Sequence, residues 1–94
     1  MDQDEPAYAF PEGVVQRNVG GEMVLLHLGR QQYFALDTVG ADIVTRLTTT
    51  SVDDAMAALT RDYDVELSVL ESDVRALVTD LLAAGLMRRA TDVE

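Results

Sequence analysis

Three short apolar segments in the first half of the chain are separated by glycine turns, and this spacing is the strongest constraint on the fold. Gly20-Gly21 suits a two-residue hairpin, because that turn needs positive φ. Gly29-Arg30 marks a second turn. Consecutive strands with short turns predict an antiparallel meander. The predicted strands are residues 14–19, 22–28 and 32–36, with 22–28 in the middle.

The rest of the chain has apolar residues at helical spacing, which predicts helices over residues 38–47, 52–62 and 69–84. Ser51 and Ser68, each followed three residues later by an acidic residue, are predicted to cap the second and third helices. Gly85 is expected to end the third. The predicted fold is therefore α+β, a three-stranded antiparallel sheet followed by three helices, with a winged-helix-like shape.

A chain of 94 residues predicts one domain. We expect the domain to span residues 13–89, with tails at 1–12 and 90–94, and no regular structure before residue 13, where both prolines lie. The middle strand is apolar on both faces. Tyr8 and Phe10 are the predicted cover for the face that does not meet the helices.

Charge excludes one class of partner. Seven Arg, no Lys and 17 acidic residues give 7 − 17 = −10, whereas binding a nucleic acid needs clustered cations. The acidic surface instead favours a neutral or basic peptide as a partner.

No feature of the sequence points to an enzyme, a metal site or a cofactor. The chain has no cysteine and a single histidine, His27, in an apolar strand. No serine has a plausible histidine partner, and no phosphate loop or metal motif occurs. No apolar stretch is long enough to span a membrane. The acidic first residues do not resemble a signal peptide, so a cytoplasmic location is expected.

The strand over residues 32–36 has an outer edge with no later strand to pair with. It lacks Lys, Pro and inward charge, the usual devices that protect an edge. The third helix has an apolar stripe of about 140°, beyond the roughly 100° needed for packing on one side. Together they could form a slot to which an extended peptide adds as a fourth strand. The alternatives are a fully packed helix, and an edge covered by the acidic tail or by a second copy.

Residues 33–43, YFALDTVGADI, resemble the Y-F-x-L-N-x-x-G-x-x-I signature of the PqqD family. An acidic start to the second helix, a Tyr-Asp-Val linker and an L-x-x-x-G-L ending at residues 81–86 fit as well, and the likeness covers about residues 13–89. Asp37 stands in place of the usual Asn, and Val44 where Trp is common. Asp also caps a helix, and Val still fills a core with less volume.

The resemblance implies a protein that binds the leader segment of a ribosomally made precursor peptide and not DNA. A short free-standing member looks most like the recognition subunit of lasso peptide biosynthesis. Its implied partners are the leader, a leader-cleaving cysteine protease and the ring-forming cyclase. Two alternatives stay open: a chaperone for a radical SAM enzyme in PQQ biosynthesis, or a winged-helix module for dimerisation or regulation.

In this interpretation the leader would pair with the third strand and lie against one border of the third helix. Leu36 could equally be pure core, Phe34 core or pocket floor, and Tyr33 an exposed aromatic or a contact to the leader or its protease. Asp73 and Asp80 could equally form a solvated face. The candidate peptide-binding residues are Gln32, Tyr33, Phe34, Ala35 and Leu36 on the strand, and Val69, Asp73, Ala76, Leu77, Asp80 and Leu81 on the helix.

Overall fold

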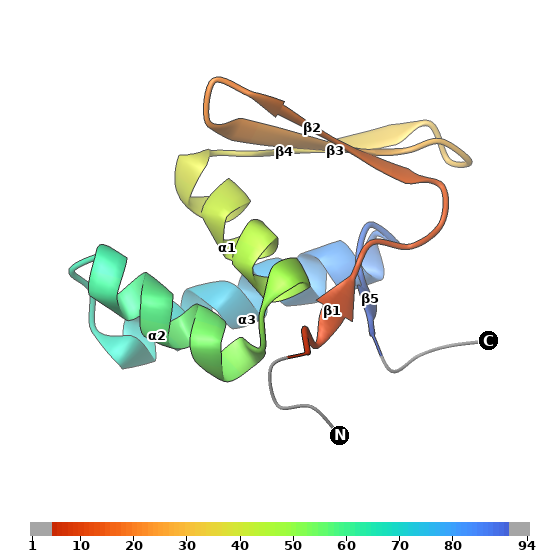
Figure 1. Ribbon diagram of the computed structural model, residues 1–94. Helices are drawn as coiled ribbons and strands as arrows, with labels where there is room; N and C mark the ends of the chain where they lie inside the picture. Colours follow the sequence, from red (N-terminus) through yellow and green to blue (C-terminus); the bar gives the residue numbers. More distant parts are fainter. Residues whose placement is uncertain (1–4, 91–94) are drawn as a thin grey trace.

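The computed structural model describes residues 5–90 and forms a sheet packed on three helices (Figure 1). Strands β2, β3 and β4 make an antiparallel sheet in that order, and β1 pairs with β5 in a separate two-stranded ribbon. The α+β prediction, with its three-stranded sheet followed by three helices, is confirmed, while the winged-helix likeness stays a prediction. The elements are β1 (Tyr8–Ala9), β2 (Val14–Val19), β3 (Glu22–His27), β4 (Gln32–Leu36), α1 (Thr38–Thr49), α2 (Val52–Asp62), α3 (Leu67–Ala83) and β5 (Arg88–Arg89).

Strand register decides which side chains enter the core. Met23 pairs with Leu36 and Leu25 with Phe34, so these four side chains share the face toward the helices. The Gly20-Gly21 turn is confirmed, since both glycines have positive φ (61° and 86°) and β2 and β3 pair directly around them. The sheet therefore has one face in the core and one facing away.

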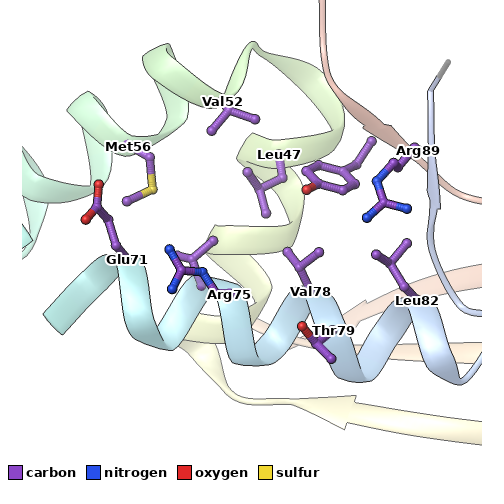
Figure 2. A pocket seen from close by; sticks show the side chains of 11 residues that line it. Leu47, Val52, Met56, Glu71, Arg75, Val78, Thr79, Leu82 and Arg89 are labelled. Carbon is purple, nitrogen blue, oxygen red and sulfur yellow. The ribbon is translucent and has the colours of Figure 1, made fainter. Parts of the chain in front are cut away.

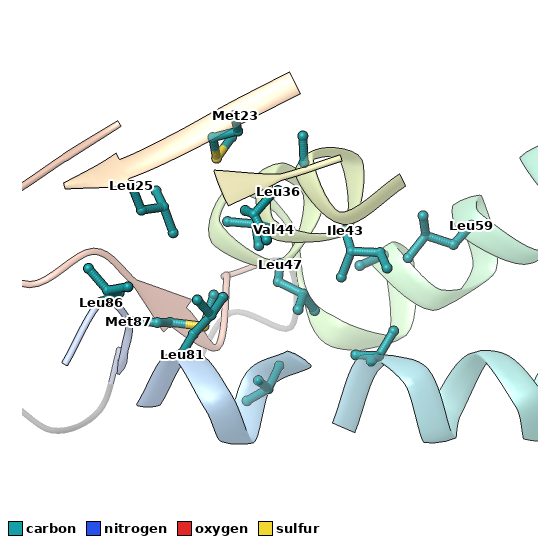
Figure 3. Close-up of a cluster of buried hydrophobic side chains, with 14 of the residues drawn as sticks. Met23, Leu25, Leu36, Ile43, Val44, Leu47, Leu59, Leu81, Leu86 and Met87 are labelled. Atoms are coloured by element: carbon teal, nitrogen blue, oxygen red, sulfur yellow. The ribbon is translucent and has the colours of Figure 1, made fainter. Parts of the chain in front are cut away.

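One continuous core joins the sheet to all three helices (Figure 3). Met23 and Leu25 on β3 meet Val44 and Leu47 on α1 and Leu81 on α3, all almost completely buried. Burying a side chain of this size stabilises the fold by roughly 1.5–3 kcal/mol. Val44 is fully buried at the position where the family resemblance suggests Trp, so the smaller residue still fills core.

Two helix starts follow the sequence and the third does not. The side chain of Asp37 accepts a hydrogen bond from the Gly40 amide (2.8 Å), and Ser51 accepts one from Asp54 (3.1 Å). The predicted cap at Ser68 is wrong: α3 begins at Leu67 with Glu66 at its N-cap and no side-chain cap bond. The Ser-x-x-Glu pattern here lies inside the first turn, where Ser68 is exposed to solvent.

The two chain ends contain more structure than expected. β1 and β5 pair, and the Ala90 amide donates to the Ala7 carbonyl (2.8 Å), so the prediction of no regular structure before residue 13 is wrong for Tyr8–Ala9. Tyr8 and Phe10 pack against the core beside the helices. They do not cover the second face of β3, and that prediction is wrong. Residues 1–4 and 91–94, in the predicted tails, lie outside the described residues.

A polar network ties α1 to the linker before α3. Arg46 pairs with Asp42 and with Asp62 (2.8 Å each), and the Tyr63 hydroxyl donates to the other Asp42 oxygen (3.0 Å). The hydrogen bond to the Asp42 carboxylate raises the pKa of Tyr63 above its ordinary value of 10.0, because ionised Tyr63 would lose that bond and face a like charge. Over residues 5–90, no helix is long and apolar enough to cross a membrane.

Tyr63→Phe should lower the free energy of unfolding by up to about 1 kcal/mol at neutral pH. Because the pKa of Tyr63 is higher in the folded than in the unfolded state, its hydrogen bond stabilises the fold fully below the unfolded pKa of 10.0. This stabilisation is lost as the pH rises through the folded-state pKa. The difference between wild type and variant should therefore shrink above that pH. Urea unfolding at neutral and alkaline pH measures it, with Tyr33→Phe as the control. An equal loss in the control, or a difference that grows with pH, would contradict the network.

Candidate functional site

The outer edge of β4 has no strand partner within residues 5–90. Strand order places β4 at one edge of the sheet and β2 at the other. An unpaired edge presents a row of backbone N–H and C=O groups that a further strand can satisfy. The expected vacancy at the third strand is therefore present in the described residues.

The two edges differ in what lies beside them. The β4 edge borders an open groove of about 440 Å³, which we call the edge groove. Beside β2, the core-facing positions carry polar Gln16 and Asn18. The edge groove thus combines free backbone groups with apolar surface, which suits an extended peptide better. It is lined by Gln31, Gln32, Tyr33, Phe34, Ala84 and Leu86.

The end of α3 fixes the far wall of the edge groove. Gly85, with φ of 74°, lets the Leu86 amide donate to the Leu81 carbonyl (2.9 Å) and its own amide to Leu82 (3.2 Å). These two bonds are the Schellman motif that ends a helix at glycine, as the sequence predicts. Because the chain turns here, Leu86 is brought under the sheet and is buried.

Arg30 connects the β3–β4 turn to the same helix end. Its guanidinium donates to the Ala84 carbonyl (3.1 Å), and its backbone amide donates to His27 Nδ1 (3.2 Å). His27 therefore accepts a hydrogen bond within the turn. Arg30 holds the start of β4 at a fixed position relative to α3.

The predicted strand residues divide by face. Phe34 is half-buried against the core and lines the edge groove, so it is both core and groove wall. Leu36 is only 5% exposed and its side chain is in the core, so only its backbone groups could contact a peptide at the edge. Tyr33 and Ala35 point to the opposite face, and Tyr33 is 73% exposed.

The predicted helix residues need one correction. Leu81 is 0% exposed and packs in the core, so its side chain cannot contact a peptide in this structure. Leu77 is half-buried at the border of the core. Val69, Asp73, Ala76 and Asp80 are exposed on α3, and none of them lines the edge groove.

Three groove residues were missed from the sequence: Gln31 in the turn before β4, and the pair Ala84 and Leu86 at the end of α3. Both flank Gly85, and a hydrophobic residue after a terminal glycine commonly packs back on the helix it follows. That signal could have identified Leu86. No such signal exists for Ala84. It lines the groove only because Arg30 holds the β3–β4 turn next to the end of α3.

The second face of the sheet is apolar and exposed. Val15 and Val19 of β2 and Leu26 of β3 lie on it, next to Tyr33. We call this surface the outer sheet face, and Arg17 supplies the charge in its lining. Its shallow hollow is lined by Val15, Arg17, Val19, Val24, Leu26, Leu28 and Tyr33. Because Tyr33 lines both this hollow and the edge groove, the two surfaces are continuous.

Residues 5–90 contain no cluster of His, Asp or Glu side chains that could hold a metal ion. Buried polar side chains without a hydrogen-bond partner are also absent from that part of the chain. The free edge of β4 offers backbone hydrogen-bonding groups, and the edge groove beside it offers apolar contact.

Comparison with known proteins gives a family and two solved structures. Residues 22–87 match the family described as coenzyme PQQ synthesis protein D (PqqD). TbiB1 in complex with the TbiA(β) leader peptide is 28% identical, with a TM-score of 0.78, over 92% of this chain and 99% of that one. Lasso peptide synthetase B1 complexed with its leader peptide is 30% identical, with a TM-score of 0.75, over 87% and 98%. No curated protein sequence matches the chain.

Arg30→Ala should lower the free energy of unfolding by about 1 kcal/mol, because the bond to the end of α3 is lost. Gly85→Ala should also destabilise by about 1 kcal/mol or more through its positive φ. An added Cβ at Gly85 would lie 3.2 Å from the Arg30 guanidinium, so the glycine substitution should cost less in the Arg30→Ala background. Thermal unfolding of the double-mutant cycle measures this coupling.

Gly13→Ala is the matched control for that cycle. Gly13 also has positive φ (89°), but no atom of the described residues lies within 4 Å of the position that an added Cβ would take there. Its cost should therefore be the same with and without Arg30. Equal coupling at both glycines would show that Arg30 does not fix the end of α3.

Proposed function

The chain belongs to the PqqD family, and we propose that it binds the leader segment of a ribosomally synthesised precursor peptide of the lasso type without catalysing a reaction itself. The observation that carries the proposal is the unpaired edge of β4 beside the apolar edge groove. Two solved relatives of the same fold hold leader peptides.

The proposed mechanism is strand addition. The leader would lie along β4 in extended form, with its backbone bonded to the free groups of Gln32–Leu36. Successive side chains of a strand point to opposite faces. Every second leader side chain would therefore enter the edge groove against Phe34 and Ala84, and the others would lie beside Tyr33.

The energies are consistent with a reversible complex. Each backbone hydrogen bond contributes roughly 0.5–1.5 kcal/mol net, and two or three buried leader side chains add about 1.5–3 kcal/mol each. Ordering a flexible peptide costs about 2–5 kcal/mol or more of this sum. The balance corresponds to a dissociation constant in the micromolar range or somewhat below.

The acidic border of α3 would extend the contact. Asp73, Leu77, Asp80 and Ala84 follow one another at spacings of four, three and four residues, so they form one ridge along the helix. Ala84 lines the edge groove, which supports the proposal that this ridge lies on the leader side. Leu77 would add apolar contact, Ala76 would leave room for a bulky leader residue, and Asp73 and Asp80 would favour polar or basic groups. Val69 would lie at the far end.

A leader-cleaving cysteine protease is the proposed partner that acts on the bound peptide, and the ring-forming cyclase is a further one. A protease that reads the bound leader needs a surface next to it. The outer sheet face meets this need, because it is apolar and continuous with the β4 edge through Tyr33. Such a role places the protein in the cytoplasm, where ribosomal peptides are made.

A second candidate function rests on the family description, which names PQQ synthesis. In that case the chain would present a precursor peptide to a radical SAM enzyme, with the same edge. The genes next to this one distinguish the two. A cysteine protease and an asparagine-synthetase-like cyclase would favour the lasso type, and a radical SAM enzyme would favour PQQ.

Ala84→Arg should weaken leader binding at least about tenfold, because a long charged side chain would fill the edge groove and have to be desolvated. Leu77→Glu should also weaken it. Fluorescence polarisation with a labelled leader from the neighbouring precursor gene measures affinity, and circular dichroism checks folding. Thr79→Arg, on the other side of α3, is the matched control and should bind normally.

Hydrogen exchange tests the strand addition itself. Amides of Gln32–Leu36 that do not bond to β3 should exchange slowly only when the leader is bound. Protection along β2 instead would move the site to the opposite edge. Protection on neither strand, with binding intact, would refute strand addition.

The remaining alternative is a module that dimerises through its sheet edge, and oligomeric state distinguishes it. We expect a monomer without peptide and a one-to-one complex with the leader, measured by analytical ultracentrifugation. A stable dimer that the leader does not dissociate would favour the dimerisation module.

A further inference from the structure

The opposite flank of α3 carries a second open cavity, distinct from the edge groove (Figure 2). It has a volume of about 300 Å³ and lies between α2, α3 and the β1–β5 ribbon. Its floor is apolar, with Leu47 and Val78 almost fully buried and Met56 and Leu82 half-buried. Among residues 5–90, none lines both this cavity and the edge groove.

Two arginines stand at the rim of this apolar floor. Arg75 reaches it from α3 and Arg89 from β5, and Figure 2 shows the Arg75 guanidinium toward the Met56 end of the cavity and the Arg89 guanidinium toward the Leu82 end. The chain has only seven cationic residues against 17 acidic ones, whereas this cavity has two arginines and one acidic residue, Glu71, so the sign of the charge is locally reversed. The reversal would attract an anion that the rest of the surface repels.

The two flanks of α3 differ in charge. Glu71, Arg75, Val78 and Leu82 form the ridge on the cavity side, with the same spacing as the ridge that carries Asp73 and Asp80 on the groove side. The wide apolar stripe predicted from the sequence is explained by this arrangement. Its two half-buried members, Leu77 and Leu82, lie on opposite flanks of the buried row.

Neither arginine is neutralised within residues 5–90. Arg46 and Arg61 account for the ion pairs found there, and neither Arg75 nor Arg89 takes part. Glu71 lies one turn before Arg75, a spacing that often gives a salt bridge. It lines the same cavity and forms no ion pair with the described part of the chain. Glu71 therefore opposes the binding of an anion, so removing its charge should strengthen that binding.

We propose that this α2–α3 cavity binds a segment of a partner protein in which a large apolar side chain is next to a carboxylate. The apolar side chain enters the space above Leu47 and Val78, and the carboxylate accepts hydrogen bonds from Arg75 and Arg89. Arginine forks match a carboxylate in geometry and charge. A free small molecule fits less well, because the cavity is open and would leave much of such a ligand in solvent.

The proposal goes beyond leader binding, because the two surfaces lie on opposite flanks of one helix. A partner at the α2–α3 cavity leaves the β4 edge free, so leader and partner can be bound together. The cavity favours an acidic ligand and the groove ridge is acidic itself, and each therefore disfavours the other's ligand.

The proposal can be tested by titrating labelled full-length protein with the dipeptide acetyl-Phe-Asp-amide at physiological salt and recording NMR spectra. We expect shifts at the Arg75 and Arg89 Nε–H groups and at the amides of Val78 and Leu82. Acetyl-Phe-Asn-amide, equal in size but uncharged, and acetyl-Ala-Asp-amide, which lacks the ring, should each bind about tenfold more weakly.

Variants complete the test. Arg75→Gln and Arg89→Gln should each weaken the acidic dipeptide about tenfold, whereas Glu71→Gln should strengthen its binding. Arg17→Gln on the outer sheet face removes the same charge away from the cavity and is the matched control. Equal binding of the Asp and Asn peptides, an equal loss with Arg17→Gln, no shifts at the cavity, or shifts along Gln32–Leu36 would each overturn the proposal. Leader affinity, measured separately on Arg75→Gln, should be unchanged.

Discussion

The backbone groups along the outer edge of β4 are the constraint on which the proposed function of this protein depends. β3 satisfies one side of β4, and within residues 5–90 no strand satisfies the other. Water can solvate such an edge, but any extended peptide offers a better match because it bonds along the whole length. Affinity from backbone bonds carries little sequence preference, so the side chains of the edge groove must supply the choice of peptide. Phe34 and Ala84, both half-buried, are the apolar residues in a position to do so.

The placement of that groove depends on how α3 ends. Gly85 turns the chain, Leu86 enters the core, and Arg30 bonds the turn before β4 to the Ala84 carbonyl. A strand edge and a helix end that are distant in sequence are thereby held together by one side chain and one glycine. An edge without this support would have its backbone groups but no defined wall, and would bind extended segments with little selection.

Much of the fold could be predicted from the sequence, because each element carried its own local signal. Gly20-Gly21 marked the hairpin, Asp37 and Ser51 capped two helices, and Gly85 ended the third. The cap predicted at Ser68 was an error of local pattern, and the other errors came from contacts between residues distant in the chain. The β1–β5 ribbon joins residues about eighty positions apart, and no local pattern announces it. Leu81 was predicted to face the leader but is buried in the core. Helical periodicity gives the width of an apolar stripe but not which of its residues the neighbouring elements cover.

The width of that stripe has a physical consequence for the protein as a whole. A helix packed on one side needs roughly 100° of apolar surface. α3 has more because its buried row is bordered by half-buried Leu77 on one flank and Leu82 on the other. One flank faces the side of the β4 edge with Asp73 and Asp80, and the other faces the α2–α3 cavity with Arg75. A domain this small has few surfaces that are both apolar and rigid. One helix with an acidic flank and a flank that carries Arg75 would let the same core support the two proposed binding surfaces, which differ in the charge of the ligand they favour.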